Sequence, residues 1–179
     1  MPHETIFYRN TINDLSHLDQ RSYDFSWTEP DYPPFQFKVW VRYSPHCYSR
    51  QVDPDEAGPD DVLVYDPHHT RVFCPERYIE TPRLVEIINS VMSKPTTRVS
   101  TTTKGNQHVF QLFIRNGSSQ RYCVFFSLKN SDVQPIDGSS HYLDAHIESA
   151  YVKDERVGVV TSMPFGRLAH HTKKNIRYR

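Results

Sequence analysis

Apolar and polar side chains alternate strictly between residues 35 and 43. The even positions include the polar side chains of Gln36, Lys38 and Arg42. A period of two is the pattern of a β-strand whose one face packs on a core. The segment therefore predicts a half-buried strand, whose buried face carries Phe35, Phe37, Val39, Val41 and Tyr43.

A helical pattern follows from residue 81. Thr81 is a suitable N-cap, and Pro82 suits the first position of a helix. Apolar residues then recur three and four positions apart, which places them on one face of a helix: Leu84, Ile87, Ile88 and Val91. Pro95 ends the pattern. This segment is the one main amphipathic helix that the sequence predicts.

The remaining patterned segments predict strands. Two short strands precede the helix and four longer ones follow it, at 62–65, 71–74, 108–115, 121–128, 142–152 and 156–160. Asn116-Gly117 indicates a hairpin turn. Strands that are joined by short turns pair antiparallel. The predicted fold class is therefore α+β, with a mostly antiparallel sheet and one main amphipathic helix packed on one face.

The same patterns divide the chain into three parts. Residues 1–34 form an N-terminal polar extension, with a short helix expected near Ile12–Leu18, and the pattern leaves open whether it belongs to the domain. Residues 35–165 are predicted to form a single α+β domain. Residues 166–179 form a basic C-terminal tail, in which His170-His171 is expected to be a flexible surface feature.

Composition limits the class of protein. The chain has 179 residues, of which 37% are hydrophobic and 13% are aromatic, which suits one globular domain. No stretch approaches the roughly 18 apolar residues of a membrane span, and the first ten residues lack the apolar run of a secretory signal. Three scattered cysteines are typical of a reducing compartment. We therefore expect a soluble, cytoplasmic protein without membrane contact.

The formal net charge is zero, but the charges are unevenly distributed. Residues 53–61 form an acidic loop that could contact a basic protein partner or mimic nucleic acid. Residues 71–121 carry eight Arg or Lys against three Glu, and the tail from residue 166 carries five against no acid. If these basic segments share one surface, RNA is the natural partner. If they do not, they are ordinary solvated faces.

Two groups of histidines and cysteines are candidates for chemistry. His46 and Cys47 follow directly on the predicted strand, but adjacent residues of an extended chain point to opposite faces. A catalytic cysteine would therefore need a partner such as His68, and a buried Cys47 is the simpler interpretation. With His69 and Cys74, these residues could supply zinc ligands, but the spacing typical of zinc sites is absent. We predict no metal and no cofactor.

Two further groups suit the recognition of phosphate. Arg77 can grip a phosphate with its planar fork, and Tyr78 can stack on a base. On the strand near the C-terminus, alternation places Ile147, Ser149 and Tyr151 on one face, where the hydroxyl and the phenol could bind a phosphate that faces an arginine. The structural alternatives are a tyrosine that packs on the helix start and an ordinary edge strand.

These motifs resemble a known family. An Arg-Tyr pair, a helix with Pro near its start and a Leu-x-x-Ile-Ile stripe, a following Pro and a β meander that ends in Ser-Ala-Tyr are similar to the barnase/EndoU/colicin/RelE-like superfamily of RNase toxins of bacteria and phages. The resemblance covers roughly residues 68–152. The fragment Tyr-Ser-x-His-Cys is also similar to small bacterial proteins of unassigned function.

The resemblance implies RNA cleavage without a metal, in which the ribose 2′-OH attacks the neighbouring phosphate. It implies that His68 or His69 is the base, that Arg77 grips the phosphate, and that Ser149 and Tyr151 form a hydroxyl pair. The family's histidine lies on or beside a longer helix, whereas here it lies in a turn, and the first 65 residues have no counterpart. The expected substrate-binding residues are Arg42, His46, Arg71 and Tyr78.

The sequence therefore leaves three alternative functions. The leading hypothesis is an RNA-acting domain, specifically a metal-independent endoribonuclease of the bacterial toxin type. The alternative is a non-catalytic protein-binding module, such as an inhibitor, immunity or adaptor protein, whose partner would be an antitoxin or a target. The third is a metal-dependent hydrolase or a metal-stabilised fold.

Overall fold

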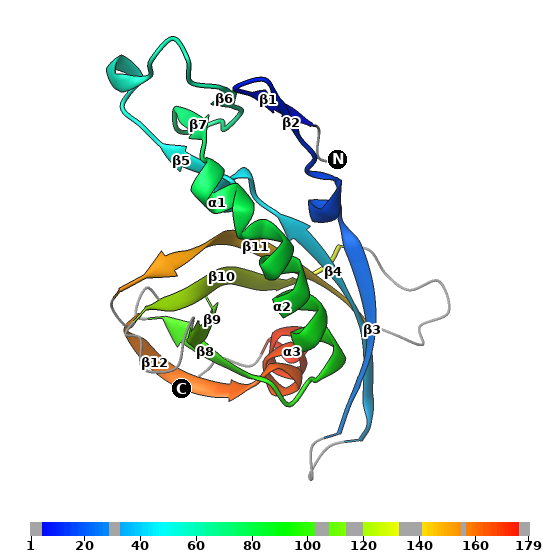
Figure 1. The fold of residues 1–179 in the computed structure, drawn as a ribbon. Helices are drawn as coiled ribbons and strands as arrows, with labels where there is room; N and C mark the ends of the chain where they lie inside the picture. Colours follow the sequence, from blue (N-terminus) through cyan, green and yellow to red (C-terminus); the bar gives the residue numbers. More distant parts are fainter. Residues whose placement is uncertain are drawn as a thin grey trace.

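The computed structural model describes residues 5–28, 33–102, 108–113, 120–132, 141–154 and 157–175. Its main feature is a curved seven-stranded sheet in the order β12-β8-β9-β10-β11-β4-β3 (Figure 1). In chain order these strands are β3 (Arg21–Trp27), β4 (Phe35–Tyr43), β8 (Arg98–Thr102), β9 (His108–Phe113), β10 (Arg121–Asn130), β11 (His141–Lys153) and β12 (Val159–Pro164).

The sheet confirms the predicted fold class. The pairs between its strands are antiparallel except for β4 and β11, which run parallel with Phe37 opposite His141 and Tyr43 opposite Ile147. The alternation in β4 is confirmed, because its odd positions are buried and its even positions are not. The parallel pair was not expected, since the prediction considered only neighbours joined by short turns. The predicted turn at Asn116-Gly117 lies outside the described residues.

Helix α2 (Thr81–Ser93) is the predicted amphipathic helix. Leu84 and Ile88 are fully buried, as the apolar stripe predicts. Thr81 is the first residue of the helix instead of its cap, and its Oγ1 donates a hydrogen bond of 2.7 Å to the carbonyl of Tyr78. The same oxygen lies 2.6 Å from Nε2 of His17, so the start of the helix is tied to the N-terminal segment.

A second helix, α3 (Phe165–Lys174), packs on the same face of the sheet as α2 (Figure 1). Phe165, Leu168 and Ala169 are fully buried in the main core together with the apolar residues of α2. His170 is only 4% exposed, so the expectation of a flexible surface histidine is wrong, because residues 165–169 anchor the segment as a helix. Among the described residues, no helix combines the length and apolar character that a membrane crossing requires.

The N-terminal segment contributes to the same core. Strand β3 forms the edge of the sheet beside β4, and Leu15 and Leu18 are buried at the 3-10 turn η1 (Ser16–Leu18). A helix was expected across Ile12–Leu18, but its first residues belong to the hairpin of β1 (Ile6–Tyr8) and β2 (Thr11–Asn13). In that hairpin Arg9 and Asn10 adopt positive φ angles, which a tight turn requires.

A small sheet beyond the end of β4 positions the candidate site. Its order is β5 (Ser49–Gln51), β7 (Arg71–Phe73) and β6 (Leu63–Val64), and both pairs are antiparallel. Helix α1 (Pro75–Ile79) follows β7 directly, and the 3-10 turn η2 (Pro45–Cys47) joins β4 to β5. A third 3-10 turn, η3 (Pro54–Glu56), lies in the acidic loop.

Gly166→Ala should destabilise the fold. A Cβ at this position would overlap the Cγ, Cδ2 and Cε3 atoms of the Trp27 indole, which lie at the base of the ring and cannot easily move away. Overpacking of this kind costs about 1–3 kcal/mol. We expect a lower midpoint in urea unfolding for Gly166→Ala. Gly58→Ala is the control, because the nearest atom to its Cβ would be Oδ2 of Asp61 at 3.8 Å, and an equal loss in both variants would contradict the prediction.

Candidate functional site

A β-bulge in β11 determines which side chains face outward near its end. The register with β10 skips Glu148, so that the consecutive residues Phe125 and Phe126 lie opposite Ser149 and Ile147. Ile147 before the bulge and Ala150 after it are both buried in the core, so Ser149 and Tyr151 lie on the face opposite Ile147. The expectation that Ile147, Ser149 and Tyr151 share one face is therefore wrong, because the bulge reverses the alternation.

Arg77 connects helix α1 to the end of β4 and to β11. Its Nη1 donates to the carbonyl of His46 at 3.0 Å and to the carbonyl of Ser49 at 2.6 Å. Its guanidinium carbon lies 5.2 Å from the centre of the Tyr151 ring, within the range of a cation–π contact. Within the described parts of the chain, Nη1 is the only nitrogen of this guanidinium that makes a hydrogen bond, so Nε and Nη2 keep their donors.

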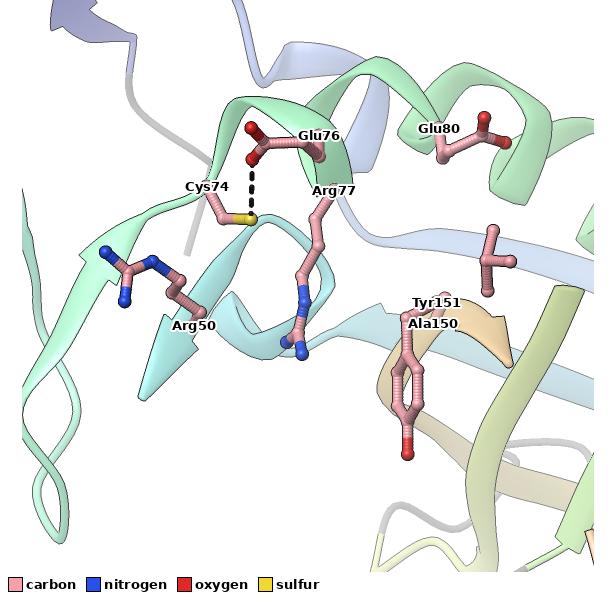
Figure 2. Close-up of a pocket in the computed structure, with 8 residues that line it drawn as sticks. Arg50, Cys74, Glu76, Arg77, Glu80, Ala150 and Tyr151 are labelled. Carbon is pink, nitrogen blue, oxygen red and sulfur yellow. Dashed lines mark hydrogen bonds between the residues drawn. The ribbon is translucent and has the colours of Figure 1, made fainter. Parts of the chain in front are cut away.

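A pocket of about 380 Å³ opens beside this arginine. Helix α1, strand β5 and the end of β11 supply its lining: Arg50, Cys74, Glu76, Arg77, Glu80, Ala150, Tyr151 and Val152. Figure 2 shows the Arg77 side chain extending from α1 toward Tyr151, while the Glu76 carboxylate lies against Cys74 at the start of the helix.

Two arginines and two glutamates line the pocket, and each glutamate contacts a further side chain. Sγ of Cys74 lies 3.3 Å from Oε2 of Glu76. The pKa of Glu76 is lowered, mainly by a hydrogen bond from its own backbone amide and then by the contact with Cys74. Glu80 forms an ion pair of 3.7 Å with Arg83 on α2. The exposed Arg50 forms no ion pair among the described residues, although its charge also contributes to the lowered pKa of Glu76.

His46 and Asp66 form a histidine–carboxylate pair beside Arg77. Nε2 of His46 lies 2.6 Å from Oδ2 of Asp66. The other oxygen of Asp66 accepts the backbone amides of His68 and His69 at 2.8 and 3.0 Å. These bonds lower the pKa of Asp66 to about 2, the bond to His46 most strongly and the amide of His68 next. The carboxylate is therefore charged at neutral pH.

His146 lies on the outward face of β11, opposite Arg42 of β4. Burial lowers the pKa of His146, and the positive charge of Arg42 lowers it further. Arg42 is itself paired with Asp144, with its Nη2 at 3.5 Å from Oδ2. A neutral imidazole is therefore favoured at this position.

The structure brings some of the predicted site residues together and separates others. Arg77 and Tyr151 are in contact, and Ser149 shares the outward face of β11 with Tyr151. His68 and His69 are exposed, and the described contacts connect them to Arg77 only indirectly, through Asp66 and His46.

The predicted substrate-binding residues also differ in their surroundings. Arg71 is buried and binds Ser49 twice. Its Nε donates to Oγ at 2.8 Å and its Nη2 donates to the carbonyl at 2.9 Å, so this arginine stabilises the small sheet. Tyr78 packs on Phe73 and donates to the carbonyl of Asp14. Arg42 is exposed and His46 is half-buried, so both remain accessible.

The sequence patterns assigned no role to Arg50, Glu76 and Glu80 of the pocket, or to Asp66 and His146 outside it. The Asp66-Pro67 turn was recognised, but nothing in the local pattern indicated that its carboxylate would bind a histidine 20 positions earlier. His146 lies in a predicted strand, where alternation places it on the face opposite Ile147. Its position opposite Arg42 is visible only in the structure.

The cysteines are all free and buried. Sγ of Cys47 lies 3.8 Å from the carbonyl of Ile147, and burial raises the pKa of this thiol to about 12. Such a thiol is a poor nucleophile at neutral pH, because the thiolate is the reactive form. Within the described residues, no group of three or more His, Cys, Asp or Glu side chains is arranged to hold a metal ion.

Asp66→Asn should remove a pH-dependent part of the stability. A carboxyl whose pKa is lowered in the folded protein stabilises the fold above its unfolded value of about 3.9, and this contribution is lost as the pH falls. For Asp66 the loss ends near its folded pKa of about 2.

The measurement is urea unfolding of the wild type and of Asp66→Asn between pH 5 and 2. We expect the difference in the free energy of unfolding to shrink as the pH falls. Asp24→Asn, which removes a carboxyl that is 79% exposed and forms a surface ion pair with Lys38, is the matched control. A difference that stays constant for Asp66→Asn would contradict the prediction.

Comparison with known proteins shows the family of this chain. The chain is 24% identical over 166 residues to the protein YjaZ of Escherichia coli (strain K12), and the alignment covers 92% of this chain and 86% of that protein. No solved structure matches the chain significantly. Neither finding bears on the resemblance to RNase toxins, which stays a prediction. The YjaZ family model matches residues 5–174, nearly the whole chain, and the protein therefore belongs to the YjaZ family.

Proposed function

We propose that this protein acts on RNA, and that the pocket beside Arg77 binds a phosphate of the RNA backbone. The observation that carries the proposal is the position of Arg77, whose guanidinium lies over Tyr151 and keeps Nε and Nη2 as donors within the described structure. Arg50 adds a second, exposed guanidinium to the same pocket. Arginine donors in a planar fork match the oxygens of a phosphate.

The size and the polar groups of the pocket support this proposal. A volume of about 380 Å³ lies in the range of small-ligand sites and suits a nucleotide. The Tyr151 ring is packed against Phe125 as well as Arg77, so its hydroxyl, not its face, is the part that can contact a ligand. Ser149 adds a hydroxyl on the same face of β11.

The specific activity we propose is that of a metal-independent endoribonuclease of the bacterial toxin type. It is supported by the resemblance over residues 68–152 and by His46, whose backbone carbonyl accepts a hydrogen bond from Arg77. A cytoplasmic location belongs to the same proposal, because RNA is present there and all three cysteines are free thiols.

A second function, a non-catalytic protein-binding module, is favoured by a different surface. Phe7 and Ile12 face each other across the β1–β2 hairpin and are 62% and 71% exposed. Tyr65, which is 85% exposed, adds another apolar side chain. Exposed apolar residues of this kind are typical of contact surfaces for proteins. Under this alternative the protein binds no RNA.

Arg50→Ala should weaken the binding of single-stranded RNA. The Arg50 side chain forms no hydrogen bond or ion pair among the described residues, whereas Arg77 donates to two backbone carbonyls, so Arg50 is the better residue for the test. Loss of one charge-assisted contact to phosphate is worth about 1–2 kcal/mol, which corresponds to an increase in Kd of roughly fivefold to thirtyfold.

The measurement is fluorescence anisotropy of a labelled RNA oligonucleotide in EDTA at several salt concentrations. Arg21→Ala is the matched control, because Arg21 is an exposed arginine on the edge strand β3 and does not line the pocket. The slope of log Kd against the logarithm of the salt concentration should become smaller by about 0.7 for Arg50→Ala and should stay unchanged for Arg21→Ala. Absence of RNA binding by the wild type would refute the proposed function and favour the protein-binding module.

A further inference from the structure

Two large aromatic side chains lie in contact on the face of the main sheet opposite helices α2 and α3 (Figure 1). Trp40 occupies an even position of β4, between Val39 and Val41. Both valines are buried in the core, so the Trp40 side chain points the other way. Tyr142 of β11 lies opposite Lys38 and shares this outward face. The two ring centres are 5.2 Å apart, and the ring planes are inclined by 41°.

This part of the outward face is accessible to solvent. Exposed residues of β3, β4 and β10 surround the two rings: Ser22, Asp24, Gln36, Arg42 and Lys129. Trp40 and Tyr142 are themselves partly exposed. Within the described structure, neither ring belongs to a buried hydrophobic cluster or packs against one. Core packing therefore does not explain why two large rings lie at these positions.

Three cations border the aromatic pair on the same face: Lys38, Arg42 and Lys129. Lys38 forms an ion pair of 3.4 Å with Asp24, and Arg42 forms one of 3.5 Å with Asp144. Exposed ion pairs of this kind stabilise a fold only weakly, so both cations can turn to a phosphate at little cost. Lys129 makes no ion pair among the described residues. The border of the aromatic pair therefore carries one positive charge in excess and suits a polyanion.

We propose that Trp40 and Tyr142 form a stacking platform for unpaired bases of the RNA whose phosphate is bound beside Arg77. This inference rests on the proposed function and names its substrate class, which is single-stranded RNA. Lys38, Arg42 and Lys129 contact the phosphates on either side of the stacked bases.

Unpaired bases are the part of RNA that an aromatic pair on an open sheet recognises. An unpaired base exposes both of its faces, and each face can stack on an aromatic side chain. In a duplex the base faces are covered by their neighbours, so aromatic residues on a sheet select single strands. The alternative is an aromatic pair that stabilises the pairing of β4 with β11, as cross-strand pairs do.

The platform and the phosphate pocket lie on the same strand. Tyr142 is near the start of β11, and Tyr151, on which Arg77 stacks, follows nine positions later on the same outward face. At about 3.3 Å per residue the two tyrosines are separated by at most about 30 Å. A dodecanucleotide is long enough to reach both, even when its bases stack at about 3.4 Å per step.

The test compares two labelled dodecamers by fluorescence anisotropy in EDTA. One is a 2′-O-methyl oligoadenylate, which cannot be cut through its own 2′-oxygen, and the other is an abasic chain with the same backbone. We expect Trp40→Leu and Tyr142→Leu each to raise the Kd for the oligoadenylate by roughly fivefold to a hundredfold, the range for loss of one stacked base. The Kd for the abasic chain should stay unchanged, because that chain offers only phosphates.

Tryptophan fluorescence tests the same contact without any variant. The oligoadenylate should quench the emission of the wild type and the abasic chain should not, because only a base can stack on Trp40. The chain has two tryptophans, and Trp27 packs against Gly166 in the fold. Trp40→Phe keeps an aromatic face, so it should bind the oligoadenylate nearly as the wild type does while the quenching is lost.

Two controls separate stacking from other effects. Tyr65→Leu replaces an aromatic residue that is 85% exposed beside the small sheet, and it should leave both Kd values unchanged. Arg50→Ala acts on the phosphate pocket and should raise the Kd for both chains. Urea midpoints close to the wild type would show that the leucine variants fold.

The outcomes distinguish this inference from the proposed function. Wild-type protein that binds both chains equally, without quenching, would overturn the platform and leave the phosphate site intact. An equal loss for both chains in Trp40→Leu would show a structural role of the ring and would also overturn the platform. Wild-type protein that binds neither chain would overturn the platform and the proposed function together.

Discussion

The parallel pairing of β4 with β11 is the contact on which the rest of the structure depends. Tyr43 lies opposite Ile147, and the pairing continues into the turn after β4 through the bond from Ser44 to Ile147. This register places the segment that begins at Ser44 against the middle of β11. The small sheet and helix α1 follow this junction in the chain, so the junction sets the position of the residues that they supply to the candidate site.

Two arginines near the junction tie the small sheet and helix α1 together. Arg71 and Arg77 both bind the carbonyl of Ser49, so this carbonyl accepts two charge-assisted hydrogen bonds. Leaving either partner unpaired would carry the desolvation cost of a buried polar group. These bonds fix helix α1 and two strands of the small sheet relative to one another, which suits a site that needs fixed distances between side chains.

The proposed phosphate site depends on which face of β11 each side chain occupies. Ile147 and Ala150 belong to the core, whereas His146, Ser149 and Tyr151 face outward because Glu148 is bulged. The helices cover the core face, as Figure 1 shows, while on the outward face Tyr151 packs against a second buried cluster that contains Cys123 and Phe125. A straight strand would have turned either His146 or Tyr151 into the core.

The sequence by itself determined the strand over 35–43, the helix that begins at residue 81 and the α+β class. These features depend on the local spacing of apolar residues, and the residues at those positions are the buried ones. It also indicated Arg77 and Tyr151. It missed β3 and β8, whose short, largely polar segments gain their strand structure from their neighbours. Only the tertiary structure decided that Asp66 binds His46, that His146 lies opposite Arg42 and that a bulge turns Tyr151 toward Arg77. These contacts join residues that are far apart in the chain, and no local pattern encodes such a pairing.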